Sequence, residues 1–183
     1  MVILPETKEI EIVEDYRDYT PPFDAERLVR ELLRTVPQKY LQGLDCVLLT
    51  NQAALPREGR VGKVWSRGRK LDKSRIRGRY WPGSRNRLPY IELRVDRIGT
   101  GLGTVSRHIP LLREAIFGRV LFHEIGHHVH YTIRPEYAEK EDVADDWAGK
   151  LNANFIRKKY WYTLFLLVPA AKLYKFMKRK RWI

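Results

Sequence analysis

Apolar and polar residues alternate in two short stretches of this chain, residues 8–13 and 90–96. This pattern predicts β-strands, in which successive side chains point to opposite faces. Residues 46–49 are a short apolar run, which predicts a third, buried strand. In residues 90–96 the apolar side chains are expected to face the core and the charged ones the outside. The expected inner set is Ile91, Leu93 and Val95, and the expected outer set is Glu92, Arg94 and Asp96.

Three longer segments are predicted to be helices. The first follows Asp24, a good N-cap residue, and has apolar residues at helical spacing up to Pro37. The second covers residues 110–131, and its initial proline suits the first turn of a helix. Pro135 then interrupts the pattern, and a third helix is predicted over residues 136–160.

The remaining segments have weaker patterns. Residues 56–87 are rich in arginine and glycine, which indicates loops or a long hairpin, and Gly101 and Gly103 mark a further loop. Residues 161–171 are uncharged and apolar, but a bilayer span needs about 20 residues. They are interpreted either as a terminal helix packed on the domain or as an interfacial membrane anchor, because basic residues flank them.

Together these elements indicate an α+β fold, in which a small mixed sheet packs on two helices. A length of 183 residues suits a single domain over residues 1–160, with residues 161–183 as a basic and apolar segment packed on it. A hydrophobic content of 44% with 31% charged residues excludes a disordered chain. The single Cys46 allows no internal disulfide and no signal peptide is evident, so we expect a cytoplasmic protein.

The formal net charge of +13 is concentrated in two segments. Residues 56–87 carry 12 basic and two acidic side chains, and residues 157–183 carry nine basic and no acidic ones. Such segments favour an anionic partner, either nucleic acid or a membrane surface, and peripheral membrane association is therefore an alternative location. The competing interpretation is that this charge only keeps the protein in solution.

The candidate chemistry lies in the second predicted helix, which contains the motif His-Glu-x-x-His at residues 123–127. Residues four apart share one helix face, so His123 and His127 are predicted to bind one zinc ion per chain. Glu124 is predicted to be the base that activates a zinc-bound water. Four of the five histidines fall within residues 123–130, on an otherwise apolar helix. Burying imidazoles without partners is unfavourable, and a metal ion removes that penalty.

The next predicted helix carries Glu-Asp-Val-Ala-Asp-Asp-Trp-Ala at residues 141–148. With the motif before it, this stretch resembles the gluzincins, the zincin clan that includes thermolysin and the small minigluzincins. The resemblance implies a zincin-like fold and a zinc-dependent peptidase. It implies that Glu141 is the third zinc ligand and that Asp145 orients His123. Small residues at Ala144 and Ala148 would let the two helices approach closely.

The sequence alone leaves other candidates for the third zinc ligand. The metzincin pattern requires a histidine six residues after His127, where this chain has Ile133. His130 roughly shares the face of His127, but three ligands from consecutive turns form a line rather than a tetrahedral cap. Asp145 or Asp146 would serve as in aspartate-ligated zincins.

The expected activity is hydrolysis of peptide bonds in a peptide or protein substrate. A donor for the developing oxyanion is also needed, and the candidates are Tyr131, Arg134 and Tyr137. The gluzincin resemblance implies that an extended substrate pairs with a sheet edge, for which residues 90–96 are the candidate strand. The alternative function is a nucleic-acid- or membrane-associated basic protein in which zinc is structural or regulatory. Structural zinc sites usually fill all four positions, often with cysteine, which this chain does not supply in a cluster.

Overall fold

The structure is a computed structural model of the whole chain, and it describes residues 9–66, 69–100, 109–133 and 140–162. The predictions for Gly101, Gly103, Arg134 and Tyr137, and for the C-terminal segment beyond residue 162, lie outside the described residues. None of the described helices is both long enough and apolar enough to cross a membrane.

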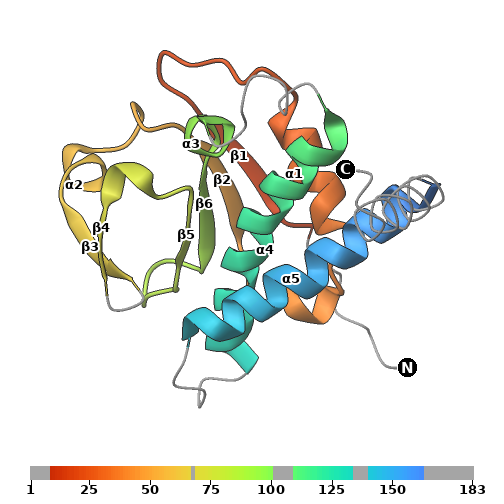
Figure 1. Cartoon of the computed structure of the whole chain (residues 1–183). Coiled ribbons are helices and arrows are strands. Elements are labelled where there is room, and N and C mark those ends of the chain that lie inside the picture. Colours follow the sequence, from red (N-terminus) through yellow and green to blue (C-terminus); the bar gives the residue numbers. More distant parts are fainter. Residues whose placement is uncertain (1–8, 67–68, 101–108, 134–139, 163–183) are drawn as a thin grey trace, which may run out of the picture.

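A four-stranded mixed sheet forms the centre of the protein (Figure 1). Its strands, in spatial order, are β1 (Glu11–Asp15), β2 (Cys46–Thr50), β6 (Tyr90–Arg94) and β5 (Gly78–Trp81). The first three are parallel, and β5 runs antiparallel to β6. The α+β class and the small mixed sheet are thus confirmed. The expectation that residues 90–96 form a sheet edge is wrong, because β5 pairs with the far side of β6 and is itself the edge.

The three main helices are α1 (Ala25–Leu33), α4 (Pro110–Ile133) and α5 (Lys140–Lys159). Asp24 caps α1 as predicted, since its carboxylate accepts a hydrogen bond of 2.8 Å from the backbone N–H of Arg27. Helices α1 and α4 pack on the same face of the sheet, and α5 crosses over α4 (Figure 1). The long predicted helix is therefore the central element that joins the sheet to α5.

The hydrophobic core lies between the sheet and these helices. Ile91 and Leu93 of β6 are fully buried there, and Val95, which begins the short α3 (Val95–Thr100), is buried as well. The predicted inner set is therefore confirmed. The core side chains that meet them from other elements include Val47, Leu49, Leu32, Phe117, Leu121 and Ile125.

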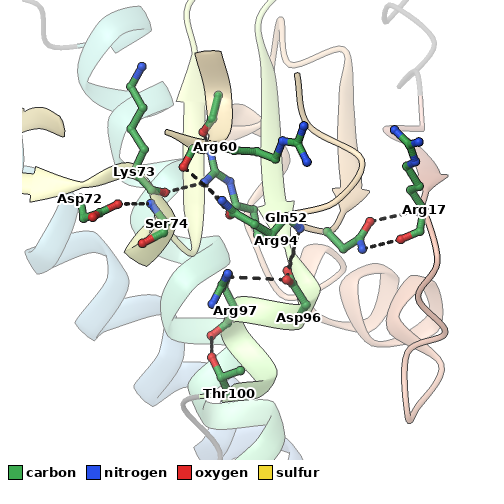
Figure 2. Close-up of polar contacts among 12 residues, drawn as sticks. Arg17, Gln52, Arg60, Asp72, Lys73, Ser74, Arg94, Asp96, Arg97 and Thr100 are labelled. Carbon is green, nitrogen blue, oxygen red and sulfur yellow. Dashed lines mark hydrogen bonds and ion pairs between the residues drawn. The ribbon is translucent and has the colours of Figure 1, made fainter. Parts of the chain in front are cut away.

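The predicted outward position of Glu92 and Arg94 is wrong. Both are buried, with 5% and 2% of their surface exposed, because a second layer covers their face of the sheet. The Arg94 Nε donates to the Glu92 carboxylate at 3.1 Å. The Arg94 Nη1 donates to the carbonyl of Lys73 at 2.7 Å (Figure 2). Asp96 is half-buried and accepts from the backbone N–H of Gln52 (Figure 2). Buried charges need such partners, and here they also anchor the covering layer.

That covering layer comes from the arginine-rich segment. It contains the short helix α2 (Arg57–Arg60), the hairpin strands β3 (Lys63–Ser66) and β4 (Arg69–Asp72), and the 3₁₀ turn η2 (Lys73–Arg75). A second 3₁₀ turn, η1 (Gln38–Tyr40), follows α1. The predicted hairpin is present, but the same segment continues into β5 and so also contributes to the main sheet.

Candidate metal centre

The His-Glu-x-x-His motif lies in the C-terminal half of α4, where α5 crosses it. The crossing is close because Gly126 of α4 faces Ala144 of α5. A Cβ atom added to Gly126 would lie 2.6 Å from the Cα of Ala144. The small residue at position 144 thus permits the predicted close approach, and it brings the first turn of α5 beside the two motif histidines.

Three donor side chains meet at this crossing. The Nε2 of His123 lies 3.5 Å from one carboxylate oxygen of Glu141, and the Nε2 of His127 lies 4.0 Å from the other. Ligand atoms of all three residues lie within 4.8 Å of one another. Zinc bonds of about 2.0–2.2 Å separate ligands by similar distances, and two imidazoles with one carboxylate form a known catalytic donor set. The residues therefore fit a zinc ion with a fourth position open.

Asp145 contacts the Nδ1 of His123, the ring nitrogen that faces away from the other two donors. Its Oδ1 lies 3.1 Å from the His123 Nδ1, one helical turn after Glu141. With the proton on Nδ1 donated to this carboxylate, the lone pair on Nε2 faces Glu141. The pair thus orients one donor of the cluster.

His127 is neutral at ordinary pH. Burial lowers its pKa to about 4, and the adjacent His123 also lowers it. Only a neutral imidazole has a lone pair for a metal, so this environment favours the metal-binding form.

Glu124 is not one of the three clustered donors; it lines the same cleft, and its side chain packs against β5. The carboxylate accepts a hydrogen bond from the backbone N–H of Tyr80. Burial is the main reason that the pKa of Glu124 is raised to about 8; Glu141 adds to the rise, and the Tyr80 N–H opposes it. A Cβ atom on Gly78 would lie 2.8 Å from the Glu124 carboxylate, so β5 packs directly against this side chain.

Two other histidines of α4 have different surroundings. His128 is fully buried, with its Nδ1 3.2 Å from the Tyr80 hydroxyl and its Nε2 3.0 Å from the backbone carbonyl of Gln42. Both contacts are hydrogen bonds if the His128 Nε2 donates to the Gln42 carbonyl and the His128 Nδ1 accepts from the Tyr80 hydroxyl. His128 therefore links α4 to β5. His130 is buried but does not belong to the donor cluster, and the exposed Asp146 pairs with Lys150 instead.

A cleft of about 890 Å³ opens beside the donor cluster. Tyr131 lines it, with its ring 5.6 Å from that of Tyr80, while Arg134 and Tyr137 are outside the described residues. The sequence prediction missed the residues that β5 contributes to the cleft, among them Gly78 and Tyr80. The alternation of arginines with Ile76, Gly78 and Tyr80 was the signal for this strand, but high arginine and glycine content obscured it.

No known protein family, curated protein or solved structure matches this chain. A functional assignment therefore depends on the chemistry of the donor cluster and the cleft.

Proposed function

We propose that this protein is a zinc-dependent metallopeptidase with a zincin-like fold of the gluzincin type. His123, His127 and Glu141 are the zinc ligands, with one zinc ion per chain. The observation that carries the proposal is the convergence of these three donors while Asp145 fixes the tautomer of His123. Three protein donors leave one position open, which favours a catalytic site over a structural one.

When bound there, zinc supplies Lewis-acid polarisation of the scissile carbonyl and lowers the pKa of a water towards about 7. The chain supplies the proton transfers. The raised pKa of Glu124 is lowered by the positive charge of the bound zinc, so its carboxylate takes a proton from the attacking water and passes it to the leaving amine, acting first as base and then as acid. The Tyr80 N–H and the close packing of Gly78 hold the Glu124 carboxylate in place. Tyr131 is the oxyanion donor candidate that lines the cleft.

The edge strand β5 is the proposed binding site for the substrate backbone. The Arg94 N–H donates to the Arg77 carbonyl at 2.8 Å, and residue 79 pairs with residue 92. Hydrogen-bonded pairs alternate in an antiparallel ladder, so the backbone groups of Gly78 and Tyr80 point away from β6. An extended peptide added along this edge would pass beside Glu124, which already takes the Tyr80 N–H.

The first experiment tests the metal site. Elemental analysis of the purified protein should find about one zinc per chain, and His127→Ala should abolish it. Glu141→Gln should weaken zinc binding, whereas Asp142→Asn, a matched control on the next, exposed residue of α5, should not. Absence of zinc in the wild type, with none taken up on addition, would refute the proposal.

The second experiment separates an enzyme from a protein with structural zinc. Glu124 is outside the donor cluster, so Glu124→Gln should retain zinc and the fold while peptide cleavage falls by about 10²–10⁴-fold or more. Cleavage is measured on a diverse peptide library, with and without a chelator. A structural site would make the substitution silent and would leave a hydroxamate inhibitor unbound, because its fourth position is filled.

A further inference from the structure

Resting on the proposed peptidase function, we propose that the cleft selects peptide segments with acidic side chains next to the bond that is cleaved. Four arginines line the cleft together with the donor cluster: Arg75, Arg77, Arg79 and Arg119. Their guanidinium groups recognise carboxylates through charge-assisted hydrogen bonds. The substrate class is therefore an extended, acidic peptide.

These arginines differ from those that stabilise the fold. Arg94 is buried and bonded to a carboxylate and to backbone carbonyls (Figure 2). In contrast, Arg75, Arg77 and Arg119 are exposed, and among the residues that the structure describes none of them is within 4.0 Å of a carboxylate. Arg79 stacks on the Trp81 ring at 3.9 Å and likewise has no carboxylate partner in the described part of the chain.

Among the described residues, the acidic side chains of the cleft form no ion pair with this group, although Arg79 acts on Glu124 at longer range. Glu141 and Asp145 lie against His123, and Glu124 is bonded to the Tyr80 N–H. These three carboxylates thus have other neighbours, while four arginines line the same cleft. Four cationic side chains in one cleft attract an anionic substrate.

The positions of the arginines follow the proposed path of the substrate. Arg77 and Arg79 flank Gly78, and a Cβ atom on Gly78 would lie 2.8 Å from the Glu124 carboxylate. Residues two apart on an extended strand share one face and are about 6.6–6.8 Å apart. Side chains on one face of a bound peptide repeat at the same distance. Arg119 faces the cleft from α4, one turn before His123 and about 6 Å away along the helix axis.

The other cleft residues favour a peptide over a nucleic acid. Val64 and Leu71 are paired across the β3–β4 hairpin and line the cleft with Ile116 and Val120 of α4. This aliphatic wall suits apolar side chains of a peptide. Binding of single-stranded nucleic acid relies on aromatic rings that stack on bases. Trp81 does not line the cleft, and its ring is stacked on Tyr90. Of the two tyrosines in the cleft lining, Tyr80 is buried and Tyr131 is exposed, so the described part of the cleft offers one exposed ring rather than a series on which successive bases could stack.

The experiment measures binding, so its result does not depend on turnover. The full-length Glu124→Gln protein is titrated with fluorescein-labelled extended peptides that differ only in carrying Glu, Gln or Lys at alternate positions, and with a short single-stranded DNA. The Glu peptide should bind about tenfold more tightly than the Gln peptide, because several ion pairs contribute roughly two- to fivefold each. Arg77→Glu and Arg119→Glu should each weaken it by about fivefold or more. Arg85→Glu, the same charge reversal at an exposed position outside the cleft, should change it less than about twofold.

Equal binding of the Glu and Gln peptides, or an equal loss with Arg85→Glu, would overturn the inference. Tighter binding of the DNA, lost in the two cleft variants, would show that the cleft holds nucleic acid and would also overturn it. If the wild type contains zinc and cleaves neutral and acidic peptides equally, the peptidase proposal stands and the acidic preference fails. If the Glu peptide binds through Arg77 and Arg119 but the protein holds no zinc, the peptidase proposal fails alone.

Discussion

Gly126 offers the sharpest test of the metal site, because it sets the distance between the two helices that carry the ligands. A Cβ atom at this position would lie 2.6 Å from the Cα and 2.9 Å from the carbonyl oxygen of Ala144. Both are backbone atoms, so no side-chain rotation relieves the contact. Gly126→Ala therefore has to move α5 away from α4.

The size of that movement follows from ordinary contact distances. To reach even 3.4 Å, the lower limit of normal van der Waals contact, the Ala144 backbone must move by about 0.8 Å. Glu141 lies three residues earlier on α5, so its carboxylate moves relative to His123 and His127. Metal–ligand distances tolerate only about ±0.2 Å, so we expect zinc affinity to fall by at least roughly 10–100-fold.

The substitution should also lower stability by about 1–3 kcal/mol, which corresponds to roughly 2–12 °C in Tm for a protein of this size. Zinc affinity is measured by competition with a chromophoric chelator, and Tm is measured on the zinc-free protein. The control is Gly149→Ala in α5, where an added Cβ meets nothing within 4 Å. It should leave zinc affinity unchanged and raise stability by about 0.4–1 kcal/mol, since alanine reduces the entropy of the unfolded chain.

Two outcomes would refute this reasoning at different points. If Gly126→Ala is as stable as the wild type, the helices are not in backbone contact at position 126. If it is destabilised but binds zinc with unchanged affinity, the third ligand does not come from α5, and Glu141 is not part of the site.

Arg94→Met should destabilise the protein by about 3–5 kcal/mol, measured by urea unfolding, because it leaves Glu92 buried without its ionic partner; a second substitution, Glu92→Leu, should recover most of the loss. Asp145→Asn should weaken zinc binding by only about 10–100-fold in the same chelator competition, since Asp145 acts through His123; complete loss would identify it as a ligand. If residues 56–87 bind a polyanion, retention on heparin should fall steeply with salt, since each neutralised anionic group of the polymer releases counterions; salt-independent retention would contradict this.

The central part of the candidate site could be predicted from sequence because it is local. His123 and His127 are four residues apart on one helix, so helical geometry alone places them on one face. Asp24 as a helix cap and the burial of Ile91 and Leu93 were predictable for the same reason. The helix cap depends on one residue type at the start of a helical pattern, and the burial of Ile91 and Leu93 depends on a period of two that fixes the direction of the side chains.

The remaining features of the fold depended on pairing between segments far apart in the chain. Alternation in residues 90–94 showed that Glu92 and Arg94 share a face, but not that a second layer covers it. A central strand and an edge strand have the same local pattern, so only the folded sheet identified β5 as the edge.

The sequence by itself determined which residues share a helix face or a strand face, because these relations depend on backbone geometry over a few residues. Only the tertiary structure decided which faces meet. It brought Glu141 to the two histidines through the Gly126–Ala144 contact, and it placed Arg77 and Arg79 in the cleft that Glu124 also lines. The physical reason is that packing joins residues far apart in the chain, and their meeting depends on shape and on the burial of every other element.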